Sequence, residues 1–345
     1  FDMEVQHELA FRVLMAGHNT GKIVLRMSAG QQRSLHGAHV ITGGTSGLGL
    51  LTGRWLAQRG ACSLVLASRS GALARATDTA WYAVQASGAT SSVERCDAGE
   101  AAHVQQVWAQ DPLNVQGAWH AAGVLADAVL PNQQAAGLAV AFAPKAHGAW
   151  SLHAAGVTST MHTFAAFSSV AALIGGPGQA NYSAANACLD ALATCRRAHG
   201  TASLSIQWGA WQEVGMAARG AASERMAAAE LASGFARISL AQGLAALGVA
   251  TRGGVACVVG MVPVVWSRFL SAQVPAFLSV FAPSGTSTGM GTVRSSGTAM
   301  SAGQTCVSLE SVLEMAKRTA GGLVDADAPL MEAGVDSLGA VELRN

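Results

Sequence analysis

The sequence is poor in charged residues, and its basic residues form no dense cluster. Of the 345 residues, 12% are charged and 50% are hydrophobic, and the formal net charge is +1. A surface for nucleic acid or another polyanion is therefore not indicated. The length and the apolar content suffice for one large domain with a substantial core and for smaller flanking pieces.

The six cysteines are not arranged for metal binding or for a disulfide framework. They form no CxxC pair and have no His/Cys ligand spacing, so we expect no metal site. Buried free thiols in a reducing compartment are the simplest interpretation, and we expect a cytoplasmic protein, with organellar targeting left open. The cysteines are Cys62, Cys96, Cys188, Cys195, Cys257 and Cys306.

The sequence also lacks a signal peptide and a membrane-spanning run. Residues 1–10, FDMEVQHELA, carry charges and lack an initiator Met, so we expect a chain excised from a longer protein. The most apolar run, VACVVGMVPVVW (Val255–Trp266), is too short to cross a bilayer and contains Pro263. It predicts a buried strand and the approach to it.

Between residues 38 and 267, short β-type runs alternate with longer helical patterns. This alternation predicts an α/β fold, a Rossmann-like doubly wound parallel sheet with helices on both faces. Two clear helical patterns are LGLLTGRWLAQRG and NYSAANACLDALATCRRAHG. The expected strands are AHVITG, SLVLAS, SSVERC, VQGAWHAA, MHTFAAFSS, SLSIQWG and VACVVGM.

The composition changes on both sides of this region. Residues 283–304 are mostly Ser, Gly and Thr, which predicts a flexible linker. Residues 305–345 return to an amphipathic helical pattern, and we expect a truncated all-α domain there. Residues 1–29 form a separate fragment at the front.

A glycine-rich loop follows the first expected strand and opens a helix. In ITGGTSGLG, glycines allow the tight turn and the close approach of backbone to a pyrophosphate at a helix N-terminus. A glycine-rich turn without a ligand is the alternative. The sequence therefore predicts a dinucleotide site.

The ends of the second and third strands refine the cofactor. Where an acid would favour NAD, the chain has Ser68 and Arg69, and Arg can pair with a 2′-phosphate, so we expect NADPH. A solvated surface Arg is the alternative. Asp97 is placed to reach the adenine, although an N-cap of the following helix explains it almost as well.

Three segments supply candidate catalytic residues. Tyr182 and Asn186 lie one turn apart on one helical face, a strand ends in Ser168 and Ser169, and a helix upstream carries Lys145. A Tyr can protonate a carbonyl oxygen if a nearby cation such as Lys145 lowers its pKa towards neutrality, and a Ser hydroxyl can stabilise the oxyanion. The alternatives are a solvated Lys, a buried Tyr and a locally bonded Asn.

Residues 36–282 resemble the catalytic half of a ketoreductase domain of a type I polyketide synthase or fatty acid synthase, within the short-chain dehydrogenase/reductase superfamily. The resemblance rests on TGGTSGLG, HAAGVLADAVL, FAPKAHGAWSLH, FSSVAALIGGPGQANYSAANACLDAL and IQWGAWQEVGMA. It implies that NADPH reduces a carrier-bound β-ketoacyl thioester to the 3-hydroxyacyl thioester. A non-catalytic scaffolding domain and a free-standing reductase of soluble ketones are the alternatives.

The resemblance also implies the roles of residues. Tyr182 is the proton donor, Ser169 the carbonyl hydrogen-bond donor, Lys145 the electrostatic partner and Asn186 the fourth member, with Lys and Asn exchanged relative to the common Tyr-x-x-x-Lys enzymes. Substrate and stereocontrol positions are Leu125, Asp127, Trp211 and Met216. Expected cofactor residues are Thr42, Gly43, Gly44, Gly47, Leu48, Gly49, Ser68, Arg69, Asp97, Ala122 and Gly123.

The stereochemical signature is similar to the B type. Leu125 and Asp127 match a Leu-Asp-Asp signature in which Ala126 replaces the first Asp, and Ile174 stands where the opposite class has Trp. This implies a D-configured hydroxyl, and Ala184, which is not Pro, implies no epimerisation of the α-carbon. A helix cap is the alternative for Asp127.

Both flanks resemble other synthase segments. LMEAGVDSLGAVELRN is similar to the phosphopantetheine motif of an acyl carrier domain, with Ser337 as the attachment residue, and a plain helix N-cap is the alternative. Residues 1–29 are similar to the end of an enoylreductase domain. Expected partners are these domains and an upstream structural ketoreductase subdomain. We expect little modification of Ser337 in the truncated fragment, since its remaining helices are absent.

Overall fold

The computed structural model describes residues 37–282, together with Arg12 and Met15. Within the main range, residues 76, 111–114, 158, 160, 217, 219–222, 253 and 271–273 are not described. The expected linker and carrier segment, including Ser337, lie outside the described residues, and so does the expected enoylreductase tail apart from Arg12 and Met15.

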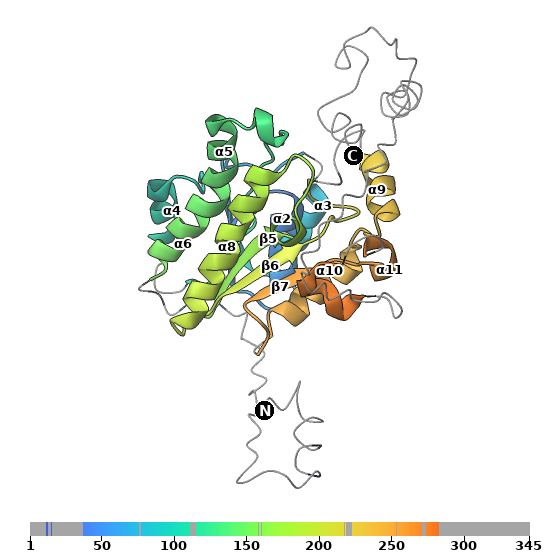
Figure 1. Ribbon diagram of the computed structural model, residues 1–345. Helices are drawn as coiled ribbons and strands as arrows, with labels where there is room; N and C mark the ends of the chain where they lie inside the picture. The colour runs from blue at the N-terminus through green and yellow to red at the C-terminus, as the bar shows by residue number, and fades with distance from the viewer. Residues whose placement is uncertain are drawn as a thin grey trace, which may run out of the picture.

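A seven-stranded parallel sheet forms the centre of the domain, in the order β3-β2-β1-β4-β5-β6-β7 (Figure 1). This confirms the doubly wound α/β fold. The strands are β1 (Ala38–Thr42), β2 (Ser63–Ser68), β3 (Thr90–Arg95), β4 (Val115–His120), β5 (Thr163–Ser169), β6 (Leu204–Trp208) and β7 (Val258–Met261).

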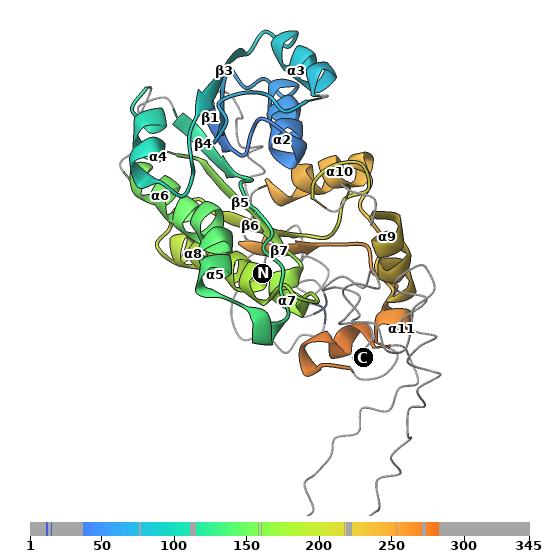
Figure 2. The ribbon, with the colours of Figure 1, turned by 90° about the horizontal axis from the view of Figure 1, so that it is seen from above.

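Helices cover both faces of the sheet, as Figure 2 shows from above. One face carries α4 (Ala101–Trp108), α6 (Gly148–Ala155) and α8 (Ala180–Ala198); the other carries α2 (Gly47–Ala57), α3 (Asp78–Gln85) and α10 (Leu240–Ala250). The remaining elements are η1 (Leu130–Asn132), α5 (Ala135–Phe142), η2 (Ala143–His147), α7 (Ala171–Ile174), α9 (Ser223–Ala232), α11 (Trp266–Phe269) and η3 (Ala276–Phe281).

The apolar residues of the strands divide into two clusters, one on each face. Ile41, Leu66 and Ile206 pack with Trp55 of α2 in one cluster, and Val40 packs with side chains of α4 and α6 in the other. Strands buried on both faces need apolar residues at successive positions, which is why β1 reads AHVIT without alternation. The sheet that carries the site is therefore packed on both faces.

Two expectations about burial were wrong. The run around β7 is half-buried because β7 is the edge strand, with β6 as its neighbour on one side. Of the cysteines, Cys96 is buried, whereas Cys62, Cys188 and Cys195 are exposed. Apolar composition alone does not show which strand ends the sheet.

The chain reverses its direction of winding between β1 and β4, which are neighbours in the sheet. From β1 the chain proceeds to β2 and β3, and from β4 it proceeds to β5, β6 and β7. Ligands of open α/β sheets bind in the crevice outside the carboxyl ends of strands at such a point. Thr42 and His120, the last residues of β1 and β4, mark this place.

Candidate active site

The turn from β1 into α2 is shaped by its glycines. Gly43 and Gly47 have φ values of 69° and 51°, a region that other residues rarely adopt. A Cβ on Gly49 would lie 2.1 Å from the carbonyl oxygen of Gly43, so the first turn of α2 packs directly on the loop. The N–H groups that open α2 therefore lie beside the crevice, where an anion can bind them.

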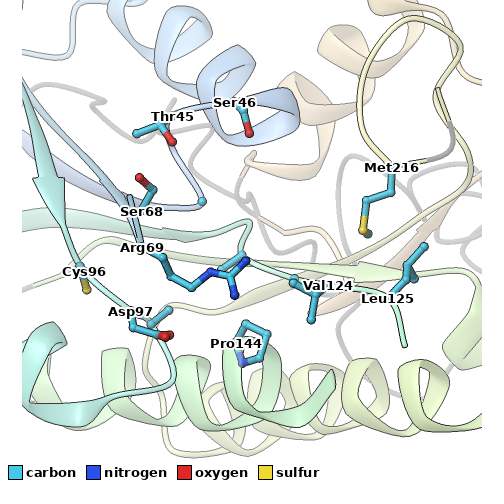
Figure 3. A pocket seen from close by; sticks show the side chains of 14 residues that line it. Thr45, Ser46, Ser68, Arg69, Cys96, Asp97, Val124, Leu125, Pro144 and Met216 are labelled. Carbon is cyan, nitrogen blue, oxygen red and sulfur yellow. The ribbon is translucent and has the colours of Figure 1, made fainter. Parts of the chain in front are cut away.

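A pocket of about 430 Å³ opens beside this turn, and Figure 3 shows the side chains that line it. Arg69, from the end of β2, and Asp97, beyond β3, both contribute to the wall. The helix-cap alternative for Asp97 is wrong, because α4 has its N-cap at Glu100 and the carboxylate accepts a hydrogen bond from the Gly99 N–H at 3.0 Å. The lining also includes Gly43, Thr45, Ser46, Ser68, Cys96, Ala98, Ala122, Gly123, Val124, Leu125, Pro144 and Met216.

The expected cofactor residues fall into two groups. Gly43, Ser68, Arg69, Asp97, Ala122 and Gly123 line the pocket. Thr42, Gly44, Gly47, Leu48 and Gly49 do not line it, and they shape the turn behind it. Thr45 and Ser46 also line the pocket and were not among the expected residues, although their place inside TGGTSGLG could have indicated them. A loop without side-chain bulk, a helix N-terminus and an Arg fit a phosphorylated dinucleotide.

Lys145 lies in the π-helical turn η2, and its side chain is only 3% exposed. The solvated-Lys alternative is therefore wrong. Its Nζ donates a hydrogen bond to the carbonyl oxygen of Phe167 at 2.6 Å and lies 5.5 Å from the ring centroid of Tyr182. Gly123 leaves the space for this side chain, since a Cβ there would lie 2.6 Å from Cε of Lys145.

Burial lowers the pKa of Lys145 from 10.5 to about 7, while attraction to the Asp190 carboxylate acts in the opposite direction. The ammonium thus loses its proton near neutral pH, whereas an ordinary Lys loses it near pH 10.5. A single-turn π-helix inside a longer helical stretch is frequent at functional sites. Here it follows α5 and precedes α6 directly, so the expected single helix is interrupted at Lys145.

His120, which the sequence analysis did not name, links the two halves of the site. Its Nδ1 lies 2.7 Å from Oγ1 of Thr42 and its Nε2 lies 2.9 Å from the carbonyl oxygen of Lys145. The ring is fully buried, and burial together with the nearby Lys145 charge lowers its pKa to about 4. A neutral imidazole therefore joins the start of the glycine turn to the element that carries Lys145.

Tyr182, Ser169 and Asn186 come together beside Lys145. Burial raises the pKa of Tyr182, which is 7% exposed, whereas hydrogen bonding with the Asn186 and Ser169 side chains lowers it. The net shift is upward, so the expected lowering towards neutrality is wrong for the protein without ligands. At neutral pH the Tyr182 hydroxyl keeps its proton and can donate it.

The helix that carries Tyr182 is fixed at its start and along its buried face. Asn181 donates a hydrogen bond from Nδ2 to the carbonyl oxygen of Ala126 at 2.7 Å, and its Oδ1 accepts from the N–H of Tyr182 at 2.7 Å. Ser168 donates to the carbonyl oxygen of Asn186 at 3.3 Å, which is a structural contact between β5 and α8. Of the two serines at the end of β5, Ser169 is thus the one that acts on the Tyr182 hydroxyl.

Asn186 is completely buried and has one unused hydrogen-bonding atom. Its Nδ2 donates to the carbonyl oxygen of Tyr182 at 2.8 Å, while its Oδ1 has no partner in the described part of the chain. A buried acceptor without a hydrogen bond raises the free energy of the folded state. Such atoms in native sites are therefore commonly bonded to water or to a ligand group. The local-bond alternative for Asn186 accounts for only one end of the amide.

The four stereocontrol positions are not all in one place. Leu125 and Met216 line the pocket from different segments, as Figure 3 shows. Asp127 accepts a hydrogen bond from Nε2 of Gln179 at 3.1 Å and precedes α5 by several residues, so it caps no helix. Trp211 is not in the pocket: it is 3% exposed and packs edge-on against Trp208, because the chain after β6 folds back onto α10.

The described part of the chain contains neither a cluster of metal ligands nor a membrane-spanning helix. No cluster of three or more His, Cys, Asp or Glu residues there could hold a metal ion. No described helix is long and apolar enough to cross a membrane.

Comparisons with known proteins agree with this geometry. The family model described as KR domain matches residues 37–213. The phthioceranic/hydroxyphthioceranic acid synthase of Mycobacterium tuberculosis is 35% identical over 362 residues, which cover 99% of this chain and 17% of that protein. A mycocerosic acid synthase-like polyketide synthase of Mycolicibacterium smegmatis is 35% identical, over 97% of this chain and 16% of its own length. The chain therefore spans less than a fifth of these relatives.

Solved structures are similar as well. A-type ketoreductases from a modular polyketide synthase share 30% identity and a TM-score of 0.67, covering 74% of this chain and 54% of theirs. The ketoreductase from the first module of phoslactomycin biosynthesis in Streptomyces sp. HK803 gives the same identity and TM-score, over 75% of this chain and 61% of its own. The KR domain model matches more than half of the chain, so the chain belongs to the family of ketoreductase (KR) domains of polyketide synthases.

Proposed function

We propose that this domain uses NADPH to reduce a carrier-bound β-ketoacyl thioester to the 3-hydroxyacyl thioester. The observation that carries the proposal is the meeting of Lys145, Tyr182, Ser169 and Asn186 beside the dinucleotide pocket, with Gly123 touching both. The four polar residues come from three elements, η2, β5 and α8, so their convergence depends on the fold. A scaffolding domain would not need them together.

Arg69 and Ser68 support NADPH as the cofactor. Both line the pocket at the end of β2, and neither is an acid that would bind the ribose hydroxyls of NADH. The Arg69 guanidinium offers a planar fork for a 2′-phosphate. When bound, NADPH supplies the hydride to the carbonyl carbon of the substrate.

The proton comes from this chain. The Tyr182 hydroxyl donates it to the carbonyl oxygen, and Ser169 donates a hydrogen bond to the same oxygen as negative charge develops there. The phenolate that remains is stabilised by the Lys145 ammonium near its ring. The free acceptor of Asn186 can hold the water through which a proton returns to Tyr182.

We further propose the B-type outcome, a D-configured hydroxyl without epimerisation. The solved relatives include A-type domains of the same fold, so the fold does not discriminate between the types. Local residues support the proposal: Leu125 at the pocket wall, Asp127 hydrogen-bonded to Gln179 of the adjoining loop, and Ile174 at the end of α7. Chiral chromatography of the product tests it, and an L-hydroxy product would refute it.

The partners that we propose are the neighbouring parts of a synthase. We propose an enoylreductase tail at 1–29, a linker at 283–304 and a carrier segment at 305–345. The alignment with the mycobacterial synthase extends over 99% of this chain, so both flanks have counterparts in one larger synthase. Ser337 is the proposed phosphopantetheine site. Mass spectrometry after incubation with a phosphopantetheinyl transferase tests our expectation of little modification in this chain.

Oxidation of NADPH with a β-ketoacyl N-acetylcysteamine thioester tests the activity. The full chain is assayed alone and with a structural ketoreductase half supplied in trans, as wild type and as Tyr182→Phe. We expect turnover from the wild type and a loss of about 10³-fold from the variant. Tyr82→Phe, at the exposed second tyrosine on α3, is the matched control and is expected to keep full activity. No turnover from the wild type in either format would refute the enzyme.

A further inference from the structure

The loop between β4 and η1, residues 121–129, forms no helix or strand, yet it contributes to the pocket wall. Leu125 is the last residue of this loop that lines the pocket, and its side chain is 41% exposed. A loop without a backbone ladder of its own is held in place by hydrogen bonds to neighbouring elements. The start of α8, which carries Tyr182, supplies such bonds to this loop.

Asn181 makes the first connection between the loop and α8. It is 1% exposed and directly precedes Tyr182 in the chain. Its Nδ2 donates to the carbonyl oxygens of Ala126 in the loop, at 2.7 Å, and of Gly137 in α5, at 3.3 Å. Its Oδ1 accepts from the Tyr182 N–H at 2.7 Å, so both ends of the amide are in use. One buried side chain thus joins the residue after Leu125 to the residue that donates the proton.

Gln133, which follows η1, makes a second connection. Its Nε2 donates to the carbonyl oxygen of Ala128 at 2.7 Å and to that of Gly178, before α8, at 3.4 Å. The Ala128 N–H donates to the same Gly178 oxygen at 2.9 Å. Gln179 and Asp127 add the exposed hydrogen bond described above. Residues 126–128 and 178–181 therefore form one hydrogen-bonded unit.

We propose that Asn181 is a positioning residue that sets the stereoselectivity of the reductase, because it holds the loop with Leu125 in a fixed place relative to Tyr182. This rests on the function proposed above. The face of the ketone that is reduced depends on how the acyl chain lies relative to the hydride and proton donors. A loop that moves independently of Tyr182 would admit both orientations of the chain, whereas a loop tied to α8 favours one of them.

Two variants loosen the loop from different elements. Asn181→Ala removes the donor to Ala126 at the start of α8, and Gln133→Leu removes the second connection without a change in α8. Ser168→Ala is the matched control, because it deletes a buried hydrogen bond between β5 and α8 and leaves the loop contacts in place. All three are made in the full chain, and thermal unfolding shows whether they are folded.

The readout is the ratio of the major to the minor 3-hydroxyacyl enantiomer, measured by chiral chromatography after reduction of the N-acetylcysteamine thioester with NADPH. A loss of folded enzyme lowers the yield of both enantiomers equally, so a merely structural defect does not move this ratio. We expect the ratio to fall about tenfold in Asn181→Ala and about threefold in Gln133→Leu, as for the loss of an ordinary hydrogen bond. Ser168→Ala is expected to change it by less than about twofold.

An active Asn181→Ala enzyme with an unchanged ratio would overturn the role of Asn181 and leave the proposed function intact. An equal fall of the ratio in Ser168→Ala would also overturn it, by showing a general loosening of α8. If Asn181→Ala does not fold, the ratio in Gln133→Leu decides in the same way. A wild type that gives mainly the L-hydroxy product would refute the B type alone, since the role of Asn181 concerns the ratio.

Hydrogen–deuterium exchange of the protein without substrate tests the same connection without turnover. We expect the backbone amides of residues 124–134 to exchange about tenfold faster in Asn181→Ala and to be unchanged in Ser168→Ala. Unchanged exchange in Asn181→Ala would overturn the proposal. Absence of turnover in the wild type would refute the proposed function, and the exchange rates would still decide whether Asn181 holds the loop.

Discussion

The two ends of the site consist of different kinds of group, backbone at one end and polar side chains at the other. At the β1 end, the glycine turn and the start of α2 offer mainly backbone, and the close contact of Gly49 with Gly43 leaves no room for side chains. At the β5 end, the side chains of Lys145 from η2, Ser169 from β5 and Asn186 from α8 meet Tyr182. The first end depends on backbone shape, and the second depends on polar side chains that are largely buried.

This difference predicts how each end fails. A substitution in the turn displaces backbone and so lowers both stability and cofactor affinity. A substitution among the buried polar side chains removes chemistry and can leave the fold intact, because buried charges stabilise a protein little or not at all. Substitutions at each end of the site test this contrast.

Lys145→Met should separate activity from stability most clearly. We expect kcat to fall about 10³-fold, while the free energy of unfolding at pH 7 changes by less than about 2 kcal/mol, since the cost of burying the ammonium disappears with it. The wild type should gain stability as the pH rises from about 7 towards 10.5, because the unfolded chain there holds a proton that folded Lys145 has lost. Urea titrations at several pH values should show this rise in the wild type and not in the variant.

His120 should make the domain sensitive to acid. The pKa of His120 is 6.5 in the unfolded chain and about 4 in the folded domain. The free energy of unfolding therefore has its full value above pH 6.5 and decreases by on the order of 3 kcal/mol as the pH falls towards 4. His120→Gln should be less stable at pH 7 and show a flatter acid dependence. His103→Gln, at an exposed position on α4, is the control, and an equal flattening there would contradict the assignment to His120.

Gly49→Ala should damage the backbone end. The added methyl group has no space beside the carbonyl of Gly43, so we expect a loss of about 2 kcal/mol in stability and weaker NADPH binding. Gly248→Ala, in α10 with nothing near its Cβ, should gain about 0.5–1 kcal/mol from helix propensity. Thermal unfolding and cofactor titration measure both, and equal behaviour of the two variants would refute the steric explanation.

Arg69→Gln should have the smallest effect. Loss of the guanidinium is expected to reduce the preference for NADPH over NADH about tenfold, through the KM for NADPH, with kcat nearly unchanged. Arg75→Gln, exposed in the same loop but outside the pocket lining, should keep the preference. Steady-state kinetics with both cofactors make this measurement.

Motif spacing within one segment gave the correct local geometry. Tyr182 and Asn186 share a helical face, Gly43 and Gly47 adopt the turn, and Arg69 lies at the pocket wall. These relations join residues that are close in the chain, so helix and strand periodicity is enough to predict them. Relations across the sheet were harder to predict: His120 was not among the expected site residues, and Trp211, which was expected in the site, lies in the core.

The sequence by itself determined the alternation of strands and helices, the glycine turn and the identity of the polar residues, because periodicity and turn chemistry are local. Only the tertiary structure decided that Lys145 is buried, that it approaches Tyr182 from another element, and that the Tyr182 pKa is raised. Burial and pKa depend on which atoms replace water around a group, and those atoms come from parts of the chain far apart in sequence. Packing therefore brings the exchanged Lys145 and Asn186 together beside Tyr182.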